Sequence, residues 1–398
     1  MKKPWTSEQL AAACGESDER LAWYAEVGLL HKDDRGDFAP DSLHRVRILH
    51  YAFRRGISDE ELALATKEQG DLLGVFEELG AASPTDQTLG QAARAADIPG
   101  ALITEFEETL GVSDDEVATE EDLQALTLLR KALDLGLPEQ ALVQLVRVFA
   151  DGMDRVTDAE VRIFHDHVHE QFRAQGLSGR ELIAATEAVG KPALELAEPA
   201  LLYFHQRMYH KANREDFLRH LAEATTPPRQ RPGETEATIM FVDLAGFTPL
   251  TVALGDSGVA EVLQRFSAVV RRNADACGGR IVKQIGDAFM LAFDRPADAV
   301  QFGLDVVRDC AGDNDLPALH VGAHHGVVLY RDGDYFGNVV NLSARITSVT
   351  AAGQFLVSAE VKDALHGTGT ARFEPLPPRA LKGVPEPVPL LAVTDTRR

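Results

Sequence analysis

The sequence predicts a multi-domain protein in which an all-α N-terminal region precedes an α+β domain. Residues 225–236, TTPPRQRPGETE, combine three prolines and a glycine with mixed charges, which is typical of an exposed linker. Before this segment the apolar residues recur at helical spacing. After it, short apolar runs such as ATIMFVDL and DAFMLAF alternate with helical stretches. Strands interleaved with helices favour an α+β or α/β domain after the linker.

The bulk composition indicates a folded protein without a membrane span. The 398 residues are 45% hydrophobic and suffice for two or three domains. No apolar run approaches the ~20 residues needed to cross a bilayer. The opening MKKPWTSEQL lacks an apolar stretch after its lysines, so we expect no signal peptide and a cytoplasmic location. Cys14, Cys277 and Cys310 lie far apart without metal-type spacing, and we expect each to be a small core residue in a reducing compartment.

The charge balance restricts the partners that the chain can bind. The formal net charge is −22. Such a field repels nucleic acid, so we expect no DNA binding. A highly charged anionic substrate would have to be held by metal ions or by local basic groups.

The helical region contains a faint internal repeat. The stretch LAAACGESDERLAWYAEVGLL begins at Leu10, and LGQAARAADIPGALITEFEETLGV begins at Leu89. After each stretch comes a segment that begins with acidic residues and continues with apolar residues at helical spacing. Each segment ends with a glycine followed by an apolar residue. This pattern predicts two related helical modules, 1–80 and 85–150. We therefore expect four parts, listed in chain order: a helical module 1–80, a helical regulatory and dimerisation domain 85–224, a linker 225–236 and a catalytic domain 237–398.

The first module resembles the winged helix-turn-helix head of MerR-type regulators. The resemblance depends on SEQLAAACGESDERLAWYAEVGLL and on DFAPDSLHRVRILHYAFRRGIS. Acidic residues outnumber basic ones over residues 1–70, whereas a DNA reader requires a basic stripe. We expect this fold to serve here as a regulatory or dimerising unit, with DNA binding as the alternative.

Two carboxylates beside glycines are candidate metal ligands. In ATIMFVDLAGFTPL, Asp243 ends an apolar strand before a turn into a helix. In IVKQIGDAFM, Gly286 and Asp287 lie between apolar flanks, which predicts a hairpin. Either aspartate alone could be a turn or capping residue. Together they suit Mg²⁺, which prefers one or two carboxylates with waters and substrate phosphates, and they could bridge two ions.

Lys283 lies in the same apolar run, four residues before Asp287. A lysine that points into a pocket must find an acceptor, because burying it unpaired costs several kcal/mol. A purine ring nitrogen or carbonyl would serve, and so would a carboxylate. The alternative is a lysine whose ammonium group reaches solvent.

The last third of the chain contributes three further polar candidates. In RDGDYFGNVVNLSARITSVT a turn precedes a helix, and Asn341 and Arg345 lie at i and i+4 on one face of that helix. In RALKGVPEPVPLLAV, Lys382 precedes a glycine in a loop that leads to a final strand. Each of these could also be an ordinary solvated side chain.

Four stretches in this order resemble the class III nucleotidyl cyclases. They are FVDLAGFT, KQIGDAFM, GDYFGNVVNLSARI and LKGV, and they cover about 160 residues from residue 235 onward. The resemblance implies a ferredoxin-like βαββαβ catalytic domain. It also implies an adenylate cyclase that converts ATP to cyclic AMP and pyrophosphate.

The resemblance implies a role for each matching position. Asp243 and Asp287 look like the metal-binding carboxylates, which would hold two Mg²⁺ or Mn²⁺ ions per site. Lys283 and Asp334 look like the pair that reads adenine. This pair is the adenylyl pattern, and a guanylate cyclase is the alternative.

The other matches concern the ribose and the phosphates. Asn341 is similar to the residue that orients the ribose, Arg345 to the transition-state arginine, and Lys382 to the lysine that holds the terminal phosphates. The family forms its sites between two chains, so we expect a homodimer with two interface sites. The remaining alternative is a MerR-type DNA-binding regulator with a non-catalytic nucleotide-sensing domain.

The helical region resembles that of autoinhibited, pH-responsive bacterial cyclases, notably in LRKALDLGLPEQALVQLVRVFADGM. Histidines are candidate proton sensors because their unperturbed pKa is ~6.5. The alternative for each of them is a solvated helix face. The stretch KPALELAEPALLYFHQRM is apolar enough to form a dimer core or to hold a lipid. The candidate histidines are His165, His169, His205, His210 and His220, of which the first two could also begin a zinc site.

Overall fold

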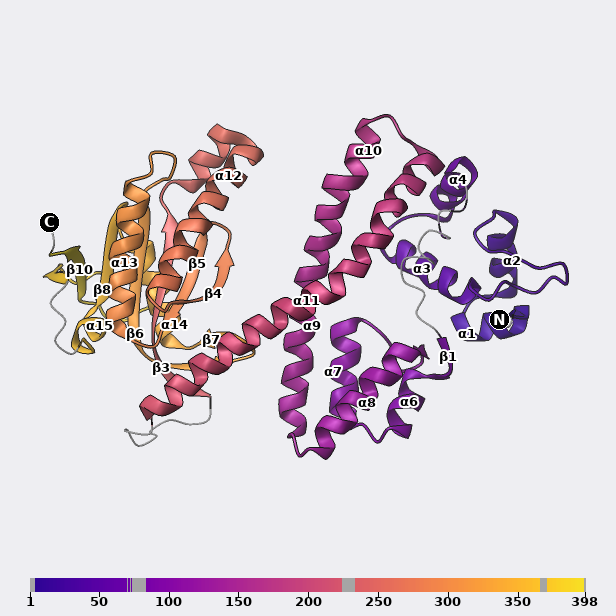
Figure 1. Cartoon of the computed structure of the whole chain (residues 1–398), viewed down its shortest axis with the longest axis horizontal. Coiled ribbons are helices and arrows are strands. Elements are labelled where there is room, and N and C mark those ends of the chain that lie inside the picture. The colour runs from indigo at the N-terminus through magenta and orange to yellow at the C-terminus, as the bar shows by residue number, and fades with distance from the viewer. Residues whose placement is uncertain are drawn as a thin grey trace. The chain divides into compact units, whose positions relative to one another are not determined.

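The structure is a computed structural model that describes residues 4–69, 71, 73, 84–223, 233–365 and 371–396. It divides the chain into two compact units, Met1–Thr225 and Thr226–Arg398 (Figure 1). Residues 225–232 of the expected linker lie outside the described residues. A strand begins at Glu234, so the last residues assigned to the linker belong to a sheet.

Helices dominate the first unit. The first module has four of them among its described residues, α1 (Ser7–Cys14), α2 (Asp18–Glu26), α3 (Ser42–Arg54) and α4 (Asp59–Gln69). The second module contains β1 (Pro84–Thr88), α6 (Leu89–Ala95), α7 (Gly100–Leu110), β2 (Val117–Thr119) and α8 (Glu120–Asp134). Three further helices and a π-helical turn follow, namely α9 (Glu139–Phe164), η1 (His165–His169), α10 (Glu170–Ala174) and α11 (Gly179–Glu223).

The two modules begin in the same way. The side chain of Thr6 caps α1 and Gln9 returns a hydrogen bond, while Thr88 and Gln91 form the same capping box on α6. Each module encloses its own apolar cluster. The repeat seen in the sequence therefore corresponds to a repeated local structure.

The N-terminal region is helical but not strictly all-α. Strands β1 and β2 form a two-stranded antiparallel sheet, and Thr85 Oγ1 donates a hydrogen bond to the carbonyl of Ala118 across it. A bridge between Trp5 and Phe38 occupies the matching place in the first module. Pairings this short show no apolar alternation in the sequence, which is why helical periodicity alone missed them.

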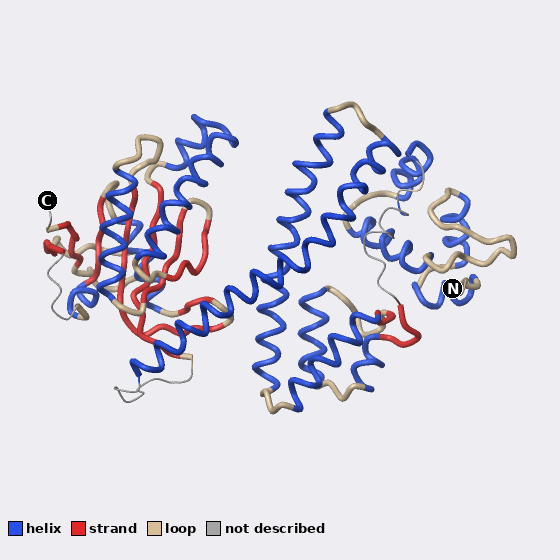
Figure 2. The backbone as a smooth tube through the Cα atoms, in the orientation of Figure 1, coloured by secondary structure: helices blue, strands red, loops and turns tan. Residues whose placement is uncertain are grey.

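The second unit is built on one mixed sheet, drawn red in Figure 2. Its strands are β3 (Glu234–Leu244), β4 (Arg280–Ile285), β5 (Ala288–Phe293), β6 (Leu319–Arg331), β7 (Asp334–Phe336), β8 (Gln354–Ser358), β9 (Ala371–Pro375) and β10 (Leu390–Asp395). They lie in the order β4-β5-β3-β6-β8-β10-β9, and β7 pairs with β6. Only β6 and β8 pair in parallel among the described strands.

Helices cover the two faces of this sheet unequally. On one face α12 (Phe247–Ala276) and α13 (Pro296–Ala311) pack on a large core that includes Met240 and Val242. On the other face α14 (Asn338–Val349) packs on β3 and β6. It covers an apolar cluster that includes the buried Ile239 and the partly buried Phe241. A short helix, α15 (Ala359–Asp363), follows β8. We call the second face the α14 face.

Two of the remaining sequence predictions concern burial. Cys310 is a core residue, and burial raises the pKa of its thiol to about 12, whereas Cys14 and Cys277 are only half-buried. Within the described part of the chain, no helix is long and apolar enough to cross a membrane.

Candidate functional site

Asp243 lies on the α14 face, next to the C-terminal end of β3. Side chains alternate along a strand, so Asp243 shares a face with Phe241 and Ile239, which belong to the cluster under α14. Its backbone pairs with Ala288 of β5 on one side and with His320 of β6 on the other. The strand therefore presents a half-buried carboxylate at the edge of the apolar cluster.

Asp287 reaches the same place from the β4–β5 turn. Gly286 has a positive φ of 61°, a conformation that a glycine adopts without strain. The turn places Asp287 directly before Ala288, the residue of β5 that pairs with Asp243. Burial raises the pKa of the Asp243 carboxyl above its ordinary value, and the charge of Asp287 and a hydrogen bond to it raise it further. The two carboxylates thus lie close enough to repel each other.

This pair has the chemistry of a magnesium or manganese site. Hard oxygen ligands suit these ions, and a divalent cation would relieve the repulsion between the two carboxylates. Among the described residues, no cluster of three or more His, Cys, Asp or Glu side chains could hold a metal ion. The protein therefore offers two carboxylates here, which leaves coordination positions for substrate phosphates and water.

Lys283 forms an ion pair with Asp334, not with the nearby Asp287. Lys283 lies opposite Met290 of the α14-face cluster, just after a bulge in the β4–β5 pairing. Asp334 begins β7, directly after a turn in which Asp332 and Gly333 have positive φ. The side chains are 37% and 26% exposed, so a ligand can reach both.

The second oxygen of Asp334 is also held in place. The backbone N–H of Tyr335 donates a hydrogen bond of 2.8 Å to Asp334 Oδ1, while Oδ2 accepts from the ammonium group of Lys283. The Lys283 ammonium, a hydrogen-bond donor, therefore lies beside the Asp334 carboxylate, an acceptor, and both are held in place.

Helix α14 presents Asn341 and Arg345 on its outer side. Its inner side is anchored by Ser343, whose hydroxyl donates to the carbonyl of Ile239 at 2.9 Å. The helix lies so close to β6 that a Cβ at Gly322 would come within 2.4 Å of a backbone atom of α14. No hydrogen bond or ion pair to the side chains of Asn341 and Arg345 comes from the described residues. Both groups are available to a ligand.

Lys382 is exposed on a loop that is itself anchored. Leu381 is only 4% exposed and packs in a cluster with Ile346 of α14. Arg379 pairs with Val388 across the loop and donates a side-chain hydrogen bond of 3.1 Å to the carbonyl of Val349, at the end of α14. The loop is therefore tied to the helix that carries Arg345.

The structure brings the predicted residues together as two contacting pairs. Asp243 interacts with Asp287, and Lys283 with Asp334. No hydrogen bond or ion pair within the described ranges joins one pair to the other, or either pair to Arg345. One chain therefore presents its candidate residues as separate groups.

Sequence reasoning missed His320, which lies opposite Asp243 in the β3–β6 ladder. The imidazole lowers the pKa of Asp243, against the larger effects of burial and of Asp287. The run LHVGAHHGVVLY predicts a strand, but it does not say which residue of β3 each histidine faces. That information lies in the register, which pairs residues far apart in the chain.

The helical unit shows where the candidate proton sensors lie. The rings of His165 and His169 stack in the π-helical turn, 4.9 Å apart and inclined by 17°. Thr186 of α11 lies 3.4 Å from His169 Nδ1. His205 and His210 are exposed on α11, and the side chain of His220 lies outside the described residues. No zinc-type cluster is present in the part of the chain that the structure describes.

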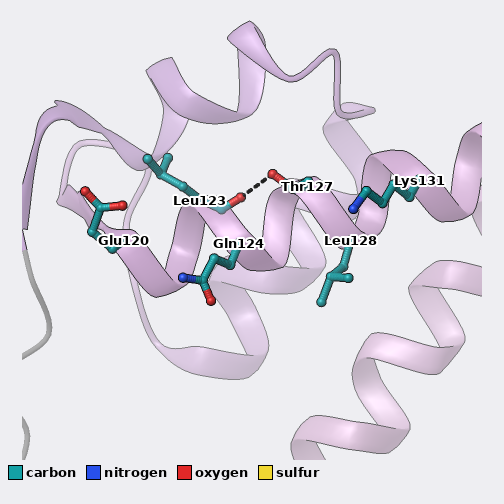
Figure 3. Close-up of a pocket in the computed structure, with 6 residues that line it drawn as sticks. All are labelled: Glu120, Leu123, Gln124, Thr127, Leu128 and Lys131. Atoms are coloured by element: carbon teal, nitrogen blue, oxygen red, sulfur yellow. Dashed lines mark hydrogen bonds between the residues drawn. The ribbon is translucent and has the colours of Figure 1, made fainter.

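A surface hollow of about 360 Å³ lies along α8 of the same unit. Its lining includes Leu123, Leu128 and Lys131 (Figure 3). The hydroxyl of Thr127 donates to the carbonyl of Leu123 within this wall, at 2.7 Å. None of the predicted site residues lines this hollow.

Comparison with known proteins assigns the second unit to a family. Residues 230–389 match the adenylate and guanylate cyclase catalytic domain. An uncharacterized protein of Mycobacterium tuberculosis is 29% identical over 89% of this chain and 91% of its own length. An adenylate cyclase of Streptomyces coelicolor is 29% identical over 71% of this chain and 72% of its own. A pH-sensitive adenylate cyclase of Mycobacterium tuberculosis is 27% identical over 68% of each chain.

Solved structures also match part of the chain. The adenylyl cyclase CyaB from P. aeruginosa is 25% identical with a TM-score of 0.37, and the match covers 42% of this chain and 96% of that one. The sequence motifs and the family model concern the second unit. Residues 230–389 of this chain form a catalytic domain of the adenylate and guanylate cyclase family, the class III nucleotidyl cyclases.

Proposed function

We propose that the chain is an adenylate cyclase that converts ATP to 3′,5′-cyclic AMP and pyrophosphate. The observation that carries this proposal is the ion pair of Lys283 with Asp334 inside a cyclase-family domain. Adenine presents a ring-nitrogen acceptor beside an amino donor, and guanine presents acceptor and donor in the opposite order. A fixed ammonium beside a fixed carboxylate therefore selects one base. Curated relatives named adenylate cyclase support adenine.

The remaining residues supply positioning and charge. Asp243 and Asp287 would hold two Mg²⁺ or Mn²⁺ ions per site. When bound, the ions would lower the pKa of the ribose 3′-hydroxyl and neutralise phosphate charge. Asn341 would orient the ribose, and Arg345 would offer its planar fork to the α-phosphoryl oxygens as pyrophosphate leaves.

Lys382 would hold the terminal phosphates from its anchored loop. These local cations also resolve the problem posed by the net charge of −22, because an acidic chain can hold ATP through metal ions and a few basic groups.

We further propose that each site is shared by two chains of a homodimer. The two contacting pairs and Arg345 are separate groups within one chain, which supports a site completed by a second copy. Two large apolar side chains that are close in sequence to candidate residues also remain exposed, as a surface covered by another domain would require. They are Ile285, two residues before Asp287, and Phe336, two residues after Asp334.

The helical unit is proposed to regulate this dimer. Many exposed apolar side chains lie along α9 and α11, including Phe149, Met153, Leu202, Phe204 and Met208. Such a surface suits dimer packing, with a bound lipid as the alternative. The similarity to a pH-sensitive adenylate cyclase of Mycobacterium tuberculosis and the stacked histidines favour protons as the signal.

Two finer expectations about fold remain proposals. The order strand, helix, strand, strand, helix, strand from β3 to β6 supports a ferredoxin-like core. The repeated capping boxes and short pairings support two MerR-like modules. The divisions 1–80, 85–224, 225–236 and 237–398 remain the proposed domain plan.

One assay tests the proposed activity. The purified full-length chain is incubated with ATP or GTP and with Mn²⁺ or Mg²⁺, and cyclic nucleotides are separated by chromatography. Cyclic AMP formed in preference to cyclic GMP supports the proposal. Preferential cyclic GMP would make the chain a guanylate cyclase. No turnover, with a DNA shift at physiological salt, would make it a MerR-type regulator.

A further inference from the structure

His320 lies directly beside a proposed metal ligand. Its Cα is the partner of the Asp243 Cα in the antiparallel β3–β6 ladder. Opposed residues of an antiparallel pair project to the same face, with Cβ atoms about 4.5–5.5 Å apart. The imidazole therefore stands on the α14 face next to the Asp243 carboxylate.

One nitrogen of this imidazole is buried without a partner. Nδ1 has no hydrogen-bond partner among the described residues, and it is one of three such buried side-chain atoms in that part of the chain. Nε2 makes no hydrogen bond or ion pair with the described residues either. A neutral imidazole carries its proton on one nitrogen only. A proton on Nε2 lets the ring donate from that nitrogen, and Asp243 is the carboxylate paired with His320 across the ladder.

The arrangement of Asp243, Asp287 and His320 argues against His320 as a direct ligand of the metal ion. Asp243, Asp287 and His320 do not form a three-residue cluster able to hold a metal ion, because the described residues contain no such cluster. His320 therefore acts through the carboxylate. Ligating carboxylates are commonly fixed by such partners, whose loss typically costs about 10–100-fold in metal affinity.

We propose that His320 is a positioning residue of the metal site: in the metal-loaded site its Nε2–H donates to the Asp243 carboxylate and fixes the oxygen that faces the ion. The described residues do not show this hydrogen bond, but the β3–β6 register places the two residues side by side. This inference rests on the proposed function, because it assumes that Asp243 is a metal ligand. It predicts that position 320 matters for metal binding rather than for nucleotide binding.

The test measures Mn²⁺ binding to the full-length protein with a non-hydrolysable ATP analogue, by electron paramagnetic resonance of the free ion. Three variants are compared. H320A removes the ring, H320Q places an amide N–H near Nε2, and H320N places it near Nδ1. H325Q is the matched control, because His325 is on the same strand but hydrogen-bonds Thr238 on the other face.

We expect H320A and H320N to bind Mn²⁺ about 10–100-fold more weakly, and H320Q and H325Q to stay within about threefold of the unmodified protein. Unchanged Mn²⁺ affinity in H320A would overturn the proposal. So would weaker analogue binding at saturating Mn²⁺ with Mn²⁺ affinity intact, because that result would place His320 against the nucleotide. Circular dichroism verifies that each variant is folded.

A separate measurement distinguishes this inference from the proposed function. If the unmodified protein makes cyclic AMP but H320A binds Mn²⁺ normally, only the positioning role fails. If the unmodified protein makes no cyclic nucleotide while H320A still weakens Mn²⁺ binding, the cyclase activity fails and the role of His320 stands.

Discussion

The ammonium group of Lys283 forms an ion pair with the carboxylate of Asp334, 51 residues further along the chain. Both side chains are partly exposed, so the pair is accessible to a ligand. Exposed pairs of this kind stabilise a fold by only about 0–1 kcal/mol. In the proposed function, the role of this pair lies in the order of donor and acceptor that it presents to the base.

Replacing Lys283 by alanine should therefore reduce activity far more than stability. We expect the kcat/KM for ATP to fall about 10–100-fold, because a hydrogen bond to a charged group contributes about 1.5–3 kcal/mol. The free energy of unfolding should change by less than about 1 kcal/mol. K362A, which removes an exposed lysine of α15, is the control and should leave both quantities unchanged. Equal losses of kcat/KM for ATP and GTP in K283A would contradict a role in base selection.

Asp243 should make the metal-free protein less stable as pH rises. Burial and the nearby Asp287 raise the pKa of this carboxyl in the folded state, so the folded chain binds the proton more tightly than the unfolded chain. The stability due to protonation is present below the ordinary pKa of about 3.9 and is lost as pH rises through the raised value. Denaturant unfolding in the presence of a chelator, between about pH 4 and 7, measures this loss.

The D243N variant is the comparison for that experiment. Asparagine cannot ionise, so the part of the pH dependence due to this position should disappear, and the variant should equal or exceed the unmodified protein in stability at neutral pH. Catalytic activity should be abolished if Asp243 holds the metal. An unchanged pH slope in D243N would show that the carboxyl does not titrate abnormally.

Much of this site follows from local sequence. Asp243 was predictable because it comes near the end of an apolar strand, and Asp287 because it follows a glycine between two apolar runs. The structure places Asp243 near the end of β3 and Asp287 in the β4–β5 turn. Helix α14 was predictable from its periodicity, including the shared outer side of Asn341 and Arg345. Local patterns suffice where the strand, turn or helix itself positions the side chain.

Long-range pairings could not be derived from local patterns. The partner of Lys283 depends on a bulge in β4 and on the β6–β7 turn, so sequence reasoning reached Asp334 only through the family resemblance. His320 was missed because its position depends on the β3–β6 register.

Arg345 should contribute to catalysis without contributing to folding. Its side chain makes no hydrogen bond or ion pair with the described residues, so R345A should change the free energy of unfolding by less than about 0.5 kcal/mol. We expect kcat to fall about 10²–10³-fold with little change in KM, as for the loss of a group that stabilises transition-state charge. R345K keeps the charge but loses the planar fork, so it should rescue little of kcat. Full activity in R345K would show that charge alone suffices.

Two inactive variants should restore each other if the site is shared. D243A removes a carboxylate and N341A removes the ribose contact, so each homodimer should be inactive. A mixed dimer would contain one site with both groups intact, and random mixing should give about a quarter of the unmodified activity by probability of assembly. Cyclic AMP formation after co-expression measures the restoration. A mixture as inactive as its parents would exclude a site built from two chains.

The helical unit should make activity depend on pH through the stacked histidines. His165 and His169 lie 4.9 Å apart in the π-helical turn, with Glu170 3.5 Å from His165 and Thr186 of α11 beside His169. Both rings lie where the π-helical turn meets α11, so a change in this turn would be transmitted to α11. We expect cyclase activity between pH 5 and 8 to follow different profiles in the full-length chain and in residues 226–398.

H169Q should bring the pH profile of the full-length chain closer to that of the catalytic unit. H210Q, which changes an exposed position on α11, should not. Identical profiles for the full-length chain and the catalytic unit would remove the helical unit from pH control.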